Sequence, residues 1–216
     1  MSERRPRLKI GSGLSDDKQV NYADFAHQSY ENNPAKEVDP DYMLIHQSPD
    51  YVTYISLPRE EIVFAIRGTS KVKDLITDAA ILKGEEKNTT EYRQLKVALK
   101  QVIDEFDGKF RIILVGHSKG GRLALDLLSD YPNDVTKVYT FSPATAPVHV
   151  FRRYFTSRGR KLHRLLKENN ERVAGDPISV LSTGHTKTIK KTKGKNSHGL
   201  NNWYNKRSSS RSGPRP

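Results

Sequence analysis

The hydrophobic pattern of the first seventy residues predicts a short helix followed by three strands. After about twenty polar residues, residues 22–30 read as a short helix that packs Phe25 inward. Three extended runs follow, rich in β-branched and aromatic residues and separated by turn signals such as Ser48-Pro49-Asp50: residues 42–45, 51–57 and 61–66. Strands joined by such short turns typically form a meander, and we expect this meander to be part of a larger sheet.

In the middle of the chain, helices alternate with strands. Apolar residues at helical spacing predict one helix that starts after Gly68 and stops near Gly84, and a second helix over residues 90–106. A strand at 112–115, a helix carrying Leu123, Leu127 and Leu128, and a strand at 137–141 come next. This alternation predicts an α/β fold, with a mostly parallel central sheet, helices on both of its faces and antiparallel strands at its N-terminal side.

The last third of the chain has a different character. Residues 146–168 read as a basic, partly helical excursion, and a brief strand is expected at residues 172–174. From Lys187 onward, two basic low-complexity segments have too few apolar residues to order themselves. Between them, HGLNNWY at residues 198–204 predicts a docked helix. We therefore expect three parts: an irregular basic arm (1–20), one domain (21–204) and a disordered basic tail (205–216).

Charge is distributed unevenly along the 216 residues. The chain has 37 Lys/Arg and 25 Asp/Glu, a net charge of +12. Residues 151–216 hold 17 Lys/Arg against 3 Asp/Glu, a net charge of +14, whereas residues 1–150 hold 20 against 22, a net charge of −2. A basic C-terminal third favours an anionic partner. We expect a membrane surface, with nucleic acid as the less favoured choice.

Composition excludes several classes of site and protein. The chain has no cysteine, so it has no disulfide and no thiolate metal site. Its histidines lack metal-binding spacing, and we expect no metal and no cofactor. Residues 1–20 do not resemble a signal peptide, and no apolar run is long enough to span a bilayer. These features favour an intracellular location, cytoplasmic with peripheral membrane contact, or a place in a virion.

The most informative motif lies at residues 111–128, RIILVGHSKGGRLALDLL. An apolar strand runs into Gly-x-Ser-x-Gly, formed by Gly116, Ser118 and Gly120, and a helix with recurring leucines follows. This is the sequence pattern of a nucleophile elbow, in which a strained turn exposes the serine hydroxyl and crowding admits only glycine on either side. The pattern predicts that Ser118 is a catalytic nucleophile.

A serine nucleophile needs a histidine to take its proton and a carboxylate to orient that histidine. In chains with this elbow, both partners follow the serine in the order acid, then histidine. Asp176 lies between a short predicted strand and a proline, and the sequence favours it as the acid. The other acids after the elbow are on its helix or in an ordinary turn: Asp126, Asp130 and Asp134.

Only two histidines follow Asp176. His198 opens the aromatic segment that predicts a docked helix, so we favour it as the general base, and His185 stays open as the alternative. The other five are set aside because they precede Asp176: His27, His46, His117, His149 and His163.

The reaction also needs two backbone amides that face the developing oxyanion. Lys119, directly after the serine, supplies the first. The turn Arg67-Gly68-Thr69 ends a predicted strand, and we expect the second amide from Thr69. A cation at position 119 opposes the helix macrodipole, so its ammonium is expected either to reach water or to attract a phosphate.

Five segments together resemble the class 3 lipase family, the fungal-lipase-like α/β-hydrolases: AIRGTSKVKDLITD (65–78), VGHSKGG (115–121), FSPATAP (141–147), GDPISVL (175–181) and HGLNNW (198–203). The resemblance covers about residues 22–204. It implies the α/β-hydrolase fold, a triad of Ser118, Asp176 and His198, and an oxyanion hole at Thr69 and Lys119. Compact members of the family occur inside eukaryotic cells and in large viruses.

The resemblance implies a serine esterase or lipase that cleaves carboxylic esters of triacylglycerols or phospholipids through an acyl-enzyme. The chain departs from the secreted lipases in two features, a polar segment at 84–92 where they carry an apolar lid and the basic C-terminal third. An alternative hypothesis follows from the second feature. In it the fold is a catalytically silent scaffold whose basic third binds nucleic acid, anionic membrane or a virion component.

Overall fold

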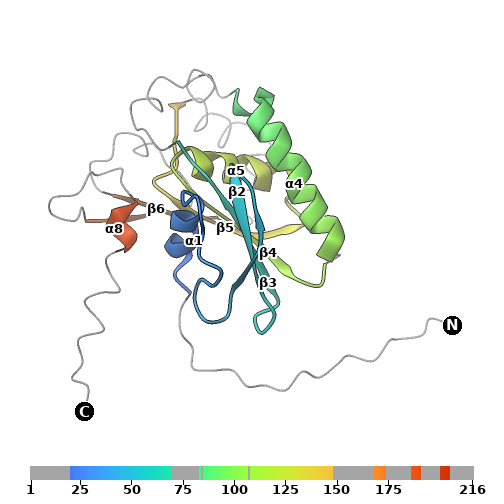
Figure 1. Cartoon of the computed structure of the whole chain (residues 1–216). Coiled ribbons are helices and arrows are strands. Elements are labelled where there is room, and N and C mark those ends of the chain that lie inside the picture. The colour runs from blue at the N-terminus through green and yellow to red at the C-terminus, as the bar shows by residue number, and fades with distance from the viewer. Residues whose placement is uncertain are drawn as a thin grey trace, which may run out of the picture.

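The protein is described by a computed structural model, shown in Figure 1. It describes residues 20–69, 83, 85–106, 108–147, 168–173, 186–190 and 200–204. The described strands form one seven-stranded sheet whose spatial order is the order of the sequence. The strands are β1 (Met43–Gln47), β2 (Tyr51–Ser56), β3 (Glu61–Ile66), β4 (Arg111–His117), β5 (Val135–Phe141), β6 (Glu168–Val173) and β7 (Thr186–Ile189).

The sheet changes from antiparallel to parallel at β3. Strands β1, β2 and β3 pair antiparallel, as the predicted meander requires. From β3 onward every pair is parallel, so the carboxyl ends of five strands meet at one edge of the sheet. This is the mostly parallel α/β-hydrolase sheet expected from the sequence, and its carboxyl edge is where such sheets place their sites.

Helices cover both faces of the sheet, as predicted (Figure 1). They are α1 (Tyr22–Gln28), the 3-10 turn η1 (Glu86–Asn88), α4 (Thr90–Phe106), α5 (Lys119–Asp130) and α8 (Asn201–Tyr204). Alternate residues of β3 face opposite sides: Val63 packs with α1 and α8, whereas Phe64 packs with α4 and α5. The two faces are therefore separate cores.

Most of the predicted elements are confirmed. The helix predicted at 90–106 has those bounds, and the predicted first helix and the three meander strands are present with ends shifted by one or two residues. Phe25 is fully buried, as expected. The helix expected after Gly68 and most of the excursion expected at 146–168 lie outside the described residues, as do the N-terminal arm and the C-terminal tail.

In the C-terminal third, one predicted element is longer than expected and one prediction is wrong. The strand expected at 172–174 is present as β6, which starts four residues earlier, at Glu168, and pairs with β5. The basic segment after Lys187 is not wholly irregular, because Thr186–Ile189 forms β7 beside β6. In both places a neighbouring strand supplies backbone hydrogen bonds to polar sequence, and in β7, at the edge of the sheet, lysine is a common residue. Within the described ranges, no helix is long and apolar enough to cross a membrane.

Candidate active site

Ser118 lies at the junction of β4 and α5, at the carboxyl edge of the sheet. Its backbone has φ 59° and ψ −124°, a conformation that non-glycine residues seldom adopt. Such strain costs about 1–3 kcal/mol and persists only where the surroundings enforce it. Here the Ser118 N–H donates to the Phe141 carbonyl at 3.0 Å, and the Ala144 N–H donates to the Ser118 carbonyl at 3.0 Å.

The two glycines that flank Ser118 lie against backbone. A Cβ on Gly116 would lie 2.4 Å from the Gly120 carbonyl carbon, and a Cβ on Gly120 would lie 2.3 Å from the Ile66 carbonyl oxygen. Because backbone atoms cannot move aside as a flexible side chain can, neither position has room for a side chain. The elbow is thus packed directly onto the end of β3.

The loop after β3 carries Thr69, the second predicted oxyanion residue. A Cβ on Gly68 would lie 2.4 Å from the His117 carbonyl oxygen and 2.3 Å from the Tyr30 hydroxyl. The loop therefore rests on the elbow, and Thr69 follows as a half-buried residue at the same edge of the sheet as Ser118 and Lys119. Donation of the Thr69 and Lys119 amides to an oxyanion stays a prediction.

The Lys119 side chain does not behave as either expectation proposed. Its ammonium pairs with the Glu91 carboxylate of α4 at 2.6 Å, and the lysine side chain is 18% exposed. A carboxylate at this distance offsets the unfavourable meeting of a cation with the start of a helix. The side chain therefore fastens α5 to α4, while the backbone amide remains at the elbow.

Asp176, His198 and the alternative base His185 lie outside the described residues. The structure does describe the elements beside two of them in the sequence: β6 ends at Val173, before Asp176, and α8 begins at Asn201, after His198. The assignment of the acid and the base stays a prediction.

The other acids after the elbow have structural partners. Asp126 pairs with Arg122 on α5 at 2.9 Å. Asp130 pairs with Lys87 at 2.5 Å and Lys96 at 3.2 Å. Partial burial alone would raise the pKa of Asp130, but its hydrogen bond with Lys87 and the charge of that lysine lower it below the usual range. The Asp126 pair lies within α5, whereas the Asp130 carboxylate joins α5 to η1 and α4. In the part of the chain that the structure describes, no group of three His, Cys, Asp or Glu residues could hold a metal.

Sequence reasoning set His117 aside, yet this residue lies in the site. Its Nδ1 is 3.0 Å from the Tyr30 hydroxyl of the segment after α1, and its ring lies edge-on to Trp203 of α8 with ring centres 6.4 Å apart. Burial raises the pKa of Tyr30 well above its usual range, so the phenol stays protonated and can donate to His117. A tyrosine 87 residues away in the chain gives no local signal of this contact.

Glu171 is a second residue that the sequence did not single out. It lies on β6, and its Oε2 accepts a hydrogen bond from Trp203 Nε1 at 2.7 Å. Its carbonyl oxygen accepts from the Ser142 N–H at 2.6 Å. The polar run that contains Glu171 was not expected to be a strand, so no pattern placed this carboxylate at the sheet.

Comparison with known proteins agrees with this architecture. The family model for lipase (class 3) matches residues 63–173, a segment that includes the elbow and ends before Asp176 and His198. No significant match was found among curated proteins.

Solved structures of fungal lipases share the fold at low sequence identity. Lipase II from Rhizopus niveus superposes with a TM-score of 0.58 at 15% identity, over 82% of this chain and 80% of its own. The Rhizopus microsporus var. chinensis lipase gives 0.56 at 19% identity, over 80% and 73%. The Rhizomucor miehei lipase in its propeptide complex gives 0.58 at 17% identity, over 79% and 67%. The match to the family model spans more than half of the sequence, and the chain belongs to the class 3 lipase family.

Proposed function

We propose that this chain hydrolyses carboxylic esters of lipids, triacylglycerols or phospholipids, through an acyl-enzyme formed on Ser118. Membership of the class 3 lipase family supports ester hydrolysis of the lipase type. The observation that carries the serine mechanism is the strained backbone of Ser118 at the start of a helix, with φ 59° in a residue other than glycine.

In the proposed mechanism, His198 takes the proton of Ser118 as the hydroxyl oxygen attacks the ester carbonyl carbon. Asp176 orients the imidazole and stabilises its charged form. The amides of Thr69 and Lys119 donate to the oxyanion, and the alcohol leaves with the proton from His198. A water then attacks the acyl-enzyme, giving its proton to His198, and the fatty acid leaves as Ser118 regains a proton.

The surroundings of Ser118 support its part in this reaction. The 12-residue helix α5 starts directly after it, so the positive end of the helix dipole lies at the elbow, where it would favour the negative charge of the oxyanion. The hydrogen bonds at the Ser118 amide and carbonyl fix the backbone before substrate arrives. Such preorganisation lowers the cost of reaching the transition state.

We also propose that the basic C-terminal third holds the protein against an anionic membrane, in a cell or a virion. Residues 151–216 hold 17 Lys/Arg, and each such residue near a negative surface adds about 1 kcal/mol of attraction. A chain truncated after residue 204 should bind phosphatidylserine vesicles more weakly than the full chain while hydrolysing a soluble short-chain ester equally well. Equal vesicle binding by both chains would contradict a part for residues 205–216, which hold four of these Lys/Arg residues.

Substitution of the nucleophile tests the main proposal. We expect Ser118→Ala to lower kcat for an ester substrate by up to about 10⁶-fold, because no other group can form the acyl-enzyme. Ser129→Ala is the matched control, since it makes the same change on α5 far from the elbow, and it should keep wild-type kcat. Full activity in folded Ser118→Ala would overturn the mechanism. A wild-type protein inactive on all esters would favour the scaffold alternative.

A further inference from the structure

Trp203 attaches the C-terminal helix α8 to the strands beside the elbow. Its Nε1 donates to Glu171 Oε2 at 2.7 Å, and its ring centre lies 5.5 Å from that of Phe141 in an edge-on contact. Only 4% of Trp203 is exposed. We call this hydrogen bond, together with the ring contacts of Trp203 with Phe141 and His117, the Trp203 latch.

The latch is continuous with the backbone that holds Ser118. His117, Phe141 and Glu171 are register partners across β4, β5 and β6, so they form one row at the carboxyl edge. The Phe141 carbonyl accepts the Ser118 N–H, and the Glu171 carbonyl accepts the Ser142 N–H. Phe141 and Glu171 therefore take part both in the backbone hydrogen bonds at the elbow and in the contacts with Trp203.

Helix α8 needs tertiary contacts to hold its position, and the latch supplies those with the strands. It has four residues, far fewer than the length at which a helix is stable by itself in water. Leu200, just before it, packs on the same core as Trp203, and the Trp203 N–H donates to the Leu200 carbonyl at 3.0 Å. A helix this short takes its position from the side chains that pack against it, and here those include Leu200 and Trp203.

We propose that Glu171 and Trp203 are positioning residues for the reaction: they hold α8 on the sheet and so keep the adjoining segment, which carries His198, within reach of Ser118. This inference rests on the proposed function, in which His198 is the general base. His198 precedes Leu200 by two residues, so a shift of α8 displaces the imidazole. A displacement of about 1 Å can cost a catalytic step about 100-fold.

Glu171 could instead be read as the carboxylate of the triad, since it is an acid that follows Ser118. The structure favours the positioning role because Glu171 Oε2 accepts from an indole N–H. The two roles differ in what they require. A latch needs an acceptor oxygen, which glutamine also offers, whereas a triad acid needs a negative charge to stabilise the imidazolium.

Three variants of the full chain separate these roles. Glu171→Leu removes the acceptor, and Trp203→Phe removes the donor while keeping an aromatic ring. We expect both to lower kcat roughly 10–100-fold with little change in KM, because substrate binding does not use the latch. Glu171→Gln should stay within about 3-fold of wild type and keep its pH–rate profile. A loss of about 10⁴-fold in Glu171→Gln would identify a triad acid and overturn the proposal.

The latch has a readout that needs no activity, because Trp203 is the only tryptophan in the chain. In Glu171→Leu we expect red-shifted emission and stronger acrylamide quenching, and in Glu171→Gln the wild-type spectrum. Tyr92→Phe is the control, since it removes a part-buried hydrogen bond of 2.9 Å to Asp130 on the other face of the sheet. It should change neither the spectrum nor kcat.

The outcomes distinguish this proposal from the proposed function. If Glu171→Leu keeps wild-type kcat while Ser118→Ala is inactive, the positioning role is contradicted and the serine mechanism is not. If the fluorescence of Glu171→Leu is unchanged, the latch itself is contradicted. If Ser118→Ala retains activity, the proposed function is contradicted, whatever the spectrum of Trp203 shows.

Discussion

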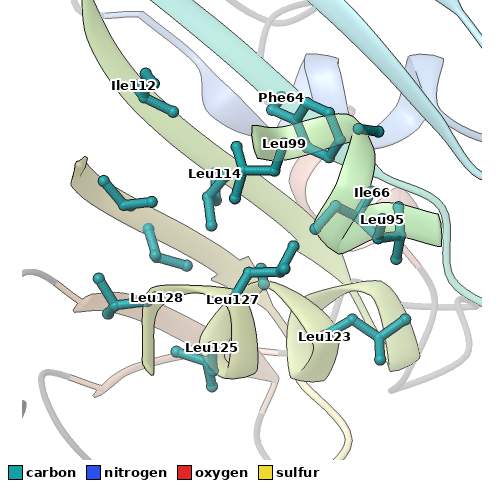
Figure 2. Close-up of a cluster of buried hydrophobic side chains, with 14 of the residues drawn as sticks. Phe64, Ile66, Leu95, Leu99, Ile112, Leu114, Leu123, Leu125, Leu127 and Leu128 are labelled. Carbon is teal, nitrogen blue, oxygen red and sulfur yellow. The ribbon is translucent and has the colours of Figure 1, made fainter. Parts of the chain in front are cut away.

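The two faces of the sheet are built from different chemistry. The face covered by α4 and α5 is a mainly aliphatic core in which leucines of both helices pack on β3 and β4 (Figure 2). The face covered by α1 and α8 is richer in aromatic side chains with polar ends. There the Tyr42 hydroxyl donates to Glu61 at 2.6 Å, the Tyr54 hydroxyl to the Ala35 carbonyl at 2.8 Å, and the Trp203 indole to Glu171 at 2.7 Å.

This difference separates the scaffold from the support of the site. Aliphatic packing is nondirectional and fixes volume, whereas hydrogen-bonded aromatic groups fix orientation. The aromatic face supplies Tyr30, His117 and Trp203, which lie next to the elbow and its neighbouring loop. We therefore expect damage to the leucine face to lower stability, and damage to the aromatic face to lower turnover as well.

The largest stability effect is expected from Leu127→Ala on the leucine face. Leu127 is fully buried in α5, and its truncation should lower the free energy of unfolding by about 2–5 kcal/mol through lost burial and a cavity. Urea unfolding measures this loss. In the protein that remains folded, kcat should equal that of wild type, and a clear fall in kcat would contradict the separation of the two faces.

Tyr30→Phe should produce a smaller stability loss together with a catalytic effect. The change removes the 3.0 Å contact with His117 Nδ1 and costs about 1 kcal/mol of stability. Because the Tyr30 hydroxyl also abuts Gly68, the loop that carries Thr69 loses support, and we expect kcat to fall several-fold. Tyr92→Phe should lose similar stability without losing turnover. Equal kcat in both variants would remove the special role of the aromatic face.

The smallest effect is expected from Asp130→Asn, measured as a function of pH. The pKa of Asp130 is lower in the folded protein than in the unfolded chain, so its ionised form stabilises the fold above about pH 4, and that stability is lost as the pH falls further. At pH 7 the variant should unfold more easily than wild type by up to about 1 kcal/mol. The difference between the two should shrink below pH 4, and a difference independent of pH would contradict this reading.

Much of the fold could be predicted because its signals are local. The amphipathic pattern of residues 90–106 set both ends of α4, and the elbow motif set the junction of β4 and α5. Strand β7 was missed because it is a strand through its pairing with β6, and the sequence of residues 186–189 alone does not show that pairing. The Lys119 ion pair and the Glu171 hydrogen bond were missed for the same reason, since each joins residues far apart in sequence.

The most direct test of the central claim is to map where a fluorophosphonate reacts with the folded wild-type protein. The account predicts one adduct, on the peptide that contains Ser118, and no adduct in Ser118→Ala at the same concentration. Ser129→Ala should label like wild type. An adduct on another residue, or labelling that persists in folded Ser118→Ala, would contradict the claim that the β4–α5 elbow carries the nucleophile.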